Sequence, residues 1–152
     1  MDRDMKLKML QFRINLYPPF LAAGIRVKHI APDYREVVVT MKLRWYNRNY
    51  VGTHFGGSLA AMTDPFYMLM LIHILGREYI VWDKTSTIDF IAPGRGTVTA
   101  RFTLNDEQIA DIKNETANGE PCYPEFSVDI VNEAGEVIAA VKKKLYVRRK
   151  KR

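Results

Sequence analysis

Cysteine is nearly absent from this sequence, because Cys122 is the only one among 152 residues. A single cysteine excludes a disulfide within the chain and fits a reducing compartment. The three histidines lie far apart and, with the one cysteine, offer no spacing typical of zinc ligands. We therefore expect neither a metal ion nor a cofactor.

Long uninterrupted apolar runs are also lacking. A membrane-spanning helix needs about 20 apolar residues, and the nearest candidate, residues 58–75, is interrupted by Asp64, Pro65 and His73. The N-terminus has no apolar core or cleavage site of a signal peptide. The sequence thus predicts no membrane span and a cytoplasmic location.

Excess charge is confined to one end of the chain. The formal net charge is +6, but residues 148–152 are all basic, and without these five charges it falls to +1. No zinc-finger spacing, RNA-recognition aromatic pattern or helix-turn-helix signature accompanies this run. We therefore expect a solvated basic tail, with no nucleic acid as partner.

Strand and helix patterns alternate in an informative order. Residues 5–16 have the spacing of an amphipathic helix, which is expected to cover the domain's own core rather than lie on a membrane, and Pro18-Pro19 ends it. The polar stretch 105–119 contains a helix-like patch at 106–113. Strands are predicted at 25–30, 36–44, 79–91, 97–104, 125–132 and 136–148.

The central apolar segment, about residues 55–75, is predicted to be a buried helix bent or divided at Pro65. Asp64 is the only formal charge from Ser58 to Leu75. A lone carboxylate buried among apolar residues costs several kcal/mol unless it is paired or neutralised. Asp64 is therefore expected either to cap a second helix that begins at Pro65 or to belong to a functional site.

These elements predict an α+β fold in which an antiparallel β-sheet wraps around one buried central helix. The domain occupies residues 24–148. Residues 1–23 form an N-terminal helical extension, and residues 149–152 form a basic C-terminal tail.

The order of elements and the residues around the central helix resemble the hotdog fold of acyl-CoA thioesterases, in particular the branch of the phenylacetate-pathway (PaaI-like) enzymes. That branch has an asparagine, then His-Gly-Gly six residues later, and an aspartate nine residues after the histidine. Asn49, Gly56, Gly57 and Asp64 stand at these spacings. Phe55 replaces the histidine of the motif, and His54 lies one residue earlier.

The resemblance implies hydrolysis of an acyl thioester. Asp64 would be the general base or nucleophile, while the Gly56 N–H and the Asn49 side chain would polarise the thioester carbonyl. The substrate would be an acyl-CoA or an acyl carrier protein thioester. Related enzymes assemble this site across a dimer interface, so a homodimer or a dimer of dimers is implied, with Asp64 facing Gly56 and Asn49 of the partner subunit.

Further residues are candidates for substrate binding. Gly57, His54 and Phe55 surround the head of the helix; Met62 and Phe66 are candidates for the acyl pocket; Lys84 and Arg95 are candidates for contacts to CoA phosphates. The Phe55 replacement favours one alternative, a hotdog module that binds an acyl or CoA group without catalysis. A hydratase or dehydratase is a third hypothesis, but its chemistry would need a well-placed histidine with an acid.

Overall fold

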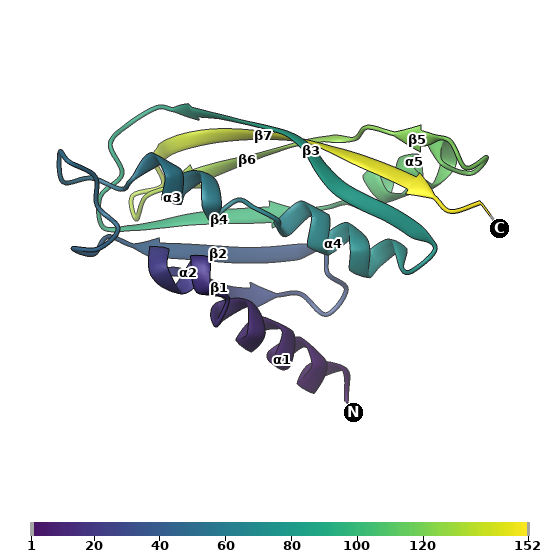
Figure 1. Cartoon of the computed structure of the whole chain (residues 1–152), viewed down its shortest axis with the longest axis horizontal. Coiled ribbons are helices and arrows are strands. Elements are labelled where there is room, and N and C mark those ends of the chain that lie inside the picture. The colour runs from purple at the N-terminus through teal and green to yellow at the C-terminus, as the bar shows by residue number, and fades with distance from the viewer. Residues whose placement is uncertain (1, 152) are drawn as a thin grey trace.

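The computed structural model describes residues Asp2–Lys151. Its frame is an antiparallel sheet with strand order β1-β2-β4-β6-β7-β3, and the short β5 pairs beside β7. The sheet curves around the central helical segment (Figure 1). The strands are β1 Ile25–Ile30, β2 Glu36–Lys42, β3 Tyr79–Phe90, β4 Thr97–Thr103, β5 Pro121–Cys122, β6 Glu125–Val131 and β7 Val137–Arg149.

The central segment consists of two helices, as its proline predicts. α3 covers Gly56–Ala61 and α4 covers Phe66–Leu75. α3 ends where the Thr63 hydroxyl and the Asp64 N–H donate to the carbonyls of Ala60 and Ala61, at 2.8 and 3.2 Å. The Asp64–Pro65 peptide bond is cis. The break places Asp64 between the two helices.

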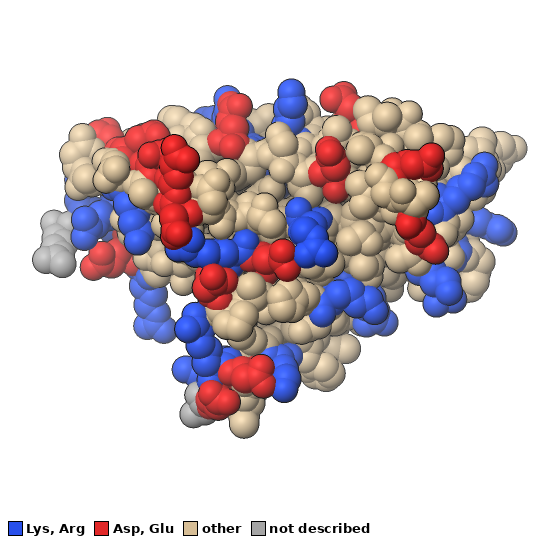
Figure 2. All heavy atoms as spheres, turned by 180° about the vertical axis from the view of Figure 1, so that it is seen from behind, with Lys and Arg blue, Asp and Glu red and all other residues tan. Residues whose placement is uncertain are grey.

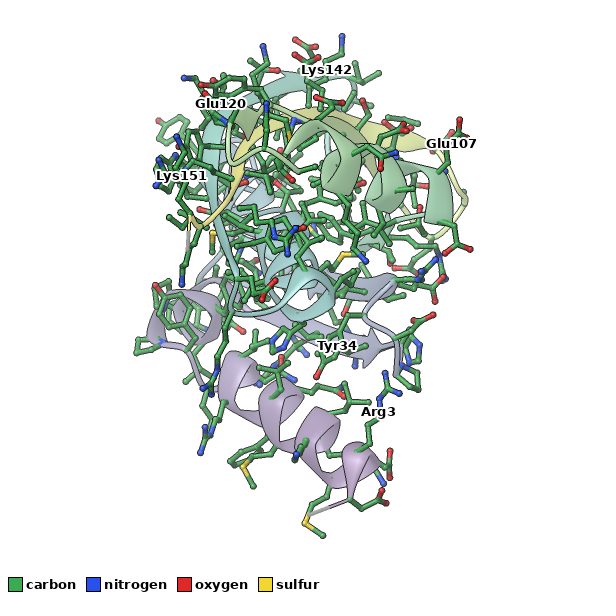
Figure 3. The ribbon with its side chains drawn as sticks, turned by 90° about the vertical axis from the view of Figure 1, so that its right-hand side faces the viewer. Arg3, Tyr34, Glu107, Glu120, Lys142 and Lys151 are labelled. Atoms are coloured by element: carbon green, nitrogen blue, oxygen red, sulfur yellow. The ribbon has the colours of Figure 1, made fainter. Side chains whose placement is uncertain are left out.

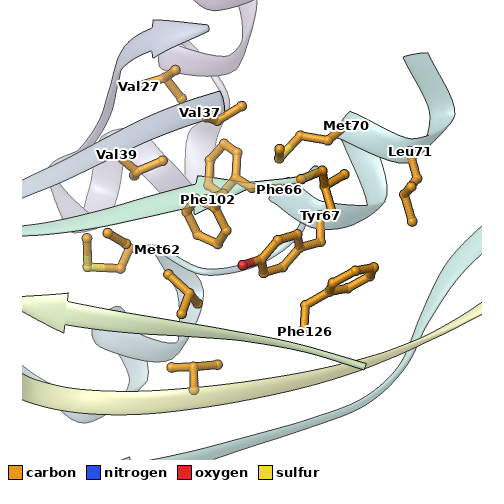
Figure 4. Close-up of a cluster of buried hydrophobic side chains, with 14 of the residues drawn as sticks. Val27, Val37, Val39, Met62, Phe66, Tyr67, Met70, Leu71, Phe102 and Phe126 are labelled. Carbon is orange, nitrogen blue, oxygen red and sulfur yellow. The ribbon is translucent and has the colours of Figure 1, made fainter. Parts of the chain in front are cut away.

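The core lies between α4 and the inner face of the sheet. Phe66 and Met70 of α4 are each 1% exposed and pack with Phe102 and the β2 valines, and Tyr67 stacks on Phe126 of β6 (Figure 4). The strands alternate buried and exposed positions, as expected when one face of an antiparallel sheet covers a core. The predicted hotdog arrangement is confirmed in the described residues.

The segment Gly56–Leu75 is long and apolar enough to cross a membrane by length and composition alone. Its most apolar window is 50% buried inside the fold. The segment therefore has the burial expected of a core helix that a sheet encloses.

Two helices precede the sheet. α1 covers Arg3–Asn15 and lies along β1, at the edge of the sheet, while α2 covers Pro18–Ala23 (Figures 1 and 3). The Asn15 side chain accepts from the Val27 N–H at 2.7 Å and donates to its carbonyl at 3.1 Å. Pro18-Pro19 end the first helix, as predicted, and also begin a second one. Leu7 of α1 is buried, but Phe12 remains 62% exposed, so α1 covers the core with only part of its apolar surface.

The last helix, α5 (Asp106–Glu115), follows β4 and is capped by a reciprocal pair of hydrogen bonds between Asn105 and Gln108. It confirms the helical patch predicted in the polar stretch, and β5 is the one strand of the described chain that the sequence pattern missed. Acidic and basic side chains are mixed over the face seen from behind (Figure 2). The basic run begins inside β7, and Arg152 of the predicted tail lies outside the described residues.

Candidate active site

Asp64 is solvent-exposed, which corrects the expectation that it is buried among apolar side chains. It lies at the break between α3 and α4, so the chain turns it out of the apolar packing. The capping hypothesis also fails, since the N-cap position of α4 is Pro65 and no side chain among the described residues caps this helix. Capping of α4 therefore does not explain why an aspartate stands at position 64.

A cavity of about 540 Å³ opens beside Asp64. One wall is formed by Ala61, Pro65 and Leu69 of the central segment, and the other by the N-terminal extension, with Arg13 of α1, Tyr17 between the helices and Phe20 of α2. The lining is mostly apolar, with a carboxylate and a guanidinium at its margins. The N-terminal extension therefore contributes directly to the surroundings of Asp64.

Gly56 begins α3 with an N–H group that has no acceptor among the described residues. A Cβ built on Gly56 would lie 2.9 Å from the Phe90 ring, and one built on Gly57 would lie 2.5 Å from the Phe55 ring. The aromatic rings therefore lie directly over the two glycines. Phe55 itself is 56% exposed, and its backbone N–H donates to the Asn47 carbonyl.

The Asn49 side chain closes the loop that leads into α3. Its Oδ1 accepts from the N–H groups of Val51 and Thr53 at 3.1 and 2.9 Å. Its Nδ2 donates to the Thr53 hydroxyl at 2.9 Å and, over a long 3.4 Å, to the His54 carbonyl. The hydrogen on this long bond is the one most easily given to another acceptor.

His54 is 3% exposed, although it lies in the loop that leads into α3. Its Nε2 lies 2.8 Å from the Gly96 carbonyl, and its Nδ1 is buried with no hydrogen-bond partner in the described chain. Burial lowers the pKa of His54, and the contact with the Gly96 carbonyl opposes this shift. The ring is therefore neutral, with Nε2 donating and Nδ1 left as an acceptor.

A second cavity, of about 510 Å³, brings Asn49, His54, Gly56 and Arg95 together. Asp64 does not line it. The structure thus assembles the predicted carbonyl-polarising groups with one predicted cation in one place, and leaves the carboxylate in another cavity of the same chain.

The other predicted binding residues lie elsewhere. The Lys84 ammonium lies 4.8 Å from the centre of the Tyr123 ring. Met62 and Phe66 are 0% and 1% exposed and line neither of these two cavities. Both are packed core side chains in this structure.

Sequence reasoning missed an ion pair whose carboxylate interacts with Asp64. Lys143 of β7 is 2% exposed, and its Nζ lies 3.4 Å from Oδ2 of Asp83 on β3. Asp83 in turn interacts with Asp64. The signal was present in the sequence, because Lys143 interrupts the alternating apolar positions Val141, Leu145 and Val147 of a predicted strand.

Residues 6–147 match a protein family described as a domain of unknown function, DUF4442. The chain belongs to the DUF4442 family. No curated protein matches its sequence.

Solved structures show which fold this DUF4442 chain shares. A Pseudomonas aeruginosa protein of unknown function, described as a probable thioesterase, superposes with a TM-score of 0.82 at 18% identity, over 94% of this chain and 95% of that one. A thioesterase from Haemophilus influenzae gives 0.70 at 18% identity, over 94% and 90%. A variant of the phenylacetic acid degradation protein PaaI from Thermus thermophilus gives 0.59 at 25% identity, over 85% and 97%.

These similarities confirm the hotdog fold and the resemblance to hotdog-fold thioesterases, PaaI among them. This DUF4442 chain has an N-terminal helical extension in addition to the sheet and its central helix. The extension lines the cavity at Asp64.

Proposed function

We propose that this protein hydrolyses an acyl thioester to a free acid and a thiol. The observation that carries the proposal is the exposed carboxylate of Asp64 at the break of the central helix, beside an apolar cavity of about 540 Å³. An apolar cavity of this kind can hold an acyl chain. The carboxylate at its margin then lies next to the thioester carbon at the end of that chain. The similarity to structures named thioesterases supports this reaction class.

Asp64 acts on water in this proposal. Its carboxylate takes one proton from a water molecule while the water oxygen bonds to the thioester carbon, and the carbonyl electrons move to the oxygen. The C–S bond then breaks, and the leaving thiolate takes the proton back from Asp64. A general base has to contact the attacking water molecule, so the solvent-exposed position of Asp64 suits this role.

The negative oxygen of this intermediate needs donors. The N–H of Gly56 has no other acceptor among the described residues, and Asn49 Nδ2 has one long hydrogen bond that a carbonyl oxygen can replace. Removal of one such donor typically costs about 3–4 kcal/mol of transition-state stabilisation. His54 supports the loop that presents these donors, because its ring donates to the Gly96 carbonyl.

Asp64 and Gly56 line different cavities of one chain, so we propose that the complete site forms between two chains. β3 offers a surface for this assembly. It is a 12-residue strand at the edge of the sheet, with β7 on one side and no strand of the described chain on the other. Unpaired edge backbone of this length is suited to pairing with the same strand of a second copy.

The carrier of the thioester is proposed to be CoA or acyl carrier protein. Arg95 lines the cavity that holds Asn49 and Gly56, so it is well placed for a phosphate of the carrier. Lys84 lies over the Tyr123 ring, and its ammonium would have to leave this contact to bind a phosphate.

The test is thiol release from short, medium, long and aromatic acyl-CoAs by the wild-type protein and by Asp64→Asn. We expect hydrolysis by the wild type and a loss of at least about 100-fold in the variant, since a positioned base contributes on this scale. Asp129→Asn, a change at an exposed aspartate of β6, is the matched control and should leave the rate unchanged. Hydrolysis that persists at full rate in Asp64→Asn would show that another group is the base.

A second function is favoured by one observation, the exposed Phe55 at the position of the family histidine. In this case the protein binds an acyl or CoA group without hydrolysing it. Saturable binding of acyl-CoA measured by calorimetry, with no thiol release by the wild type, would support this binding module and exclude the hydrolase.

A further inference from the structure

Lys143 is a charged side chain in an apolar row. The buried positions of β7 alternate along the strand, and they include Val141, Leu145 and Val147 as well as Lys143. The neighbouring Lys142 points away from the fold (Figure 3). Lys143 is 2% exposed, so its ammonium enters the interior on the side of the central helix.

The partner of this ammonium is Asp83, whose Oδ2 lies 3.4 Å from Nζ. Asp83 lies opposite Leu145 in the β3–β7 ladder, just before the irregularity between Asp83 and Thr85. Both of its oxygens are buried without a hydrogen-bond partner in the described residues. A buried ion pair of this kind is seldom more stable than apolar residues of similar size, so stability alone does not explain it.

Asp64 is the third member of this cluster. Its carboxyl interacts with that of Asp83 through charge, and protonation of either carboxyl allows a hydrogen bond between the two side chains. Two carboxylates and one ammonium leave one negative charge, and a single proton can be held between the two carboxyls. Asp64 also reaches the cavity, so it connects the buried pair with the proposed substrate site.

We propose that Asp83 and Lys143 are positioning residues that hold the Asp64 carboxylate at the helix break and act on it through their opposite charges. This inference rests on the proposed function, since it gives Asp64 the role of base. Asp83 is a like charge beside Asp64 and can share a proton with it. Lys143 is the opposite charge and stabilises the ionised form of Asp83.

One proton moves through this cluster in each turnover. A proton removed from water is received by Asp64, is shared with Asp83 while the intermediate exists, and leaves with the thiolate. The Arg13 guanidinium lines the same cavity as Asp64 and is the other charged group of the described residues on this side. Lys84 lies over the Tyr123 ring, Lys144 pairs with Glu125 at 2.7 Å, and His73 of α4 stacks on Tyr34.

The direction of titration agrees with this arrangement. Burial raises the pKa of Asp83, Lys143 lowers it, and Asp64 raises it further. Interacting carboxyls titrate as a pair, so measured values belong to the pair.

The first experiment follows the Asp83 carboxyl by ¹³C NMR in the resting protein, with no substrate. We expect its titration to lie above the ordinary range of aspartate, to move higher in Lys143→Met and to move lower in Asp64→Asn, each by about one pH unit. An Asp83 titration that neither substitution moves would overturn the inference, whether or not the protein hydrolyses thioesters. The shifts without any hydrolysis would establish the cluster and overturn only the proposed function.

The second experiment measures kcat/KM against pH. The acidic limb should move to higher pH in Lys143→Met and to lower pH in Asp83→Asn, because the two substitutions remove charges of opposite sign next to the same base. Lys144→Met removes a lysine from the neighbouring outward position and is the matched control. A pair with a merely structural role would lower the unfolding temperature and leave the acidic limb in place, and this result would overturn the inference.

Either single substitution leaves one buried charge without its partner and can impair folding. The double variant Asp83→Asn/Lys143→Met removes both charges and is expected to fold. In this variant we expect hydrolysis to persist at a lower rate, since Asp64 remains. An unchanged rate and an unchanged pH profile in the double variant would overturn the inference.

Discussion

At the scale of single residues, the glycines around the site differ in what surrounds them. A Cβ on Gly94 would lie 3.1 Å from both His54 and Ile138, which are 3% and 2% exposed and cannot move aside. A Cβ on Gly56 would meet the Phe90 ring, which is 59% exposed and free to turn. The same substitution should therefore have different consequences at the two positions.

We expect Gly94→Ala to lower the free energy of unfolding by about 1–3 kcal/mol, the usual cost of overpacking. Gly56→Ala should change stability by less, because Phe90 can turn and alanine suits a helix better than glycine. Urea unfolding of both variants provides the measurement. Equal losses of stability would show that the Phe90 ring is as fixed as the His54 ring.

The buried His54 ring makes stability depend on pH. Because burial lowers its pKa in the folded chain, the unfolded chain binds the proton first as the pH falls below about 6.5. The free energy of unfolding should therefore fall with decreasing pH in this range, and His73, whose pKa burial also lowers, should contribute in the same direction.

The measurement is urea unfolding at pH 7.5 and at pH 5.5 for the wild type and for His54→Gln. In His54→Gln, the free energy of unfolding should differ less between pH 7.5 and pH 5.5 than it does in the wild type. His29→Gln changes a surface histidine near Glu36 and serves as the control. A difference that His54→Gln leaves unaltered would contradict the assignment of this effect to His54.

At the scale of elements, the central helix α4 is fixed to the sheet by packing and by one specific hydrogen bond. The Tyr67 hydroxyl donates to the Ser127 carbonyl of β6 at 2.9 Å, and burial raises the pKa of Tyr67 to about 12. This bond is directional, unlike the apolar contacts around it. Together with the stacking of Tyr67 on Phe126, it joins α4 to β6.

Tyr67→Phe removes this bond while keeping the ring and should lower the free energy of unfolding by about 1 kcal/mol. Tyr146→Phe is the matched control, since the Tyr146 ring stacks on Trp82 and its hydroxyl has no hydrogen bond among the described residues. Thermal and urea unfolding of the two variants give the comparison. A larger loss for Tyr146→Phe would contradict this role of the Tyr67 hydroxyl.

At the scale of the whole molecule, the separation of Asp64 from Gly56 gives a test of the two-chain site. Asp64→Asn and Gly56→Val should each be inactive alone, because each damages every site of a homodimer. In a mixed dimer, one of the two sites receives Asp64 from one chain and Gly56 from the other, both intact. Random pairing makes about a quarter of all sites complete.

The measurement is thiol release after the two inactive variants are unfolded together and refolded. We expect the refolded mixture to recover activity toward a quarter of the wild-type value. Neither variant should recover activity when it is refolded alone. Sedimentation of the wild type should give at least twice the mass of a 17.6 kDa chain. Dimers without recovery of activity would place the whole site within one chain.

Several elements could be predicted from the sequence because local patterns decide them. β1 begins and ends where its β-branched residues predicted it, and the proline at position 65 divided the central helix as expected. β5 was missed because two residues carry no periodicity. Pro18-Pro19 were predicted to stop a helix, but proline is also favoured in the first turn of one, and only the packing of Phe20 decides between the two roles.

The candidate site was predictable in part. The spacing of Asn49, Gly56, Gly57 and Asp64 is a property of the sequence. The exposure of Asp64, the burial of His54 and the core positions of Met62 and Phe66 were not, since each depends on how a side chain turns relative to distant strands.

The sequence by itself determined the order of the elements, the apolar central helix and the family motif, because these follow from neighbouring residues and their spacing. Only the tertiary structure brought Lys143 and Asp83 to Asp64, from strands separated by about sixty residues in the ladder of β3 with β7. It also placed Asp64 and Gly56, at opposite ends of α3, on different cavities of the chain. The meeting of distant strands depends on the closure of the whole sheet, which no local pattern contains.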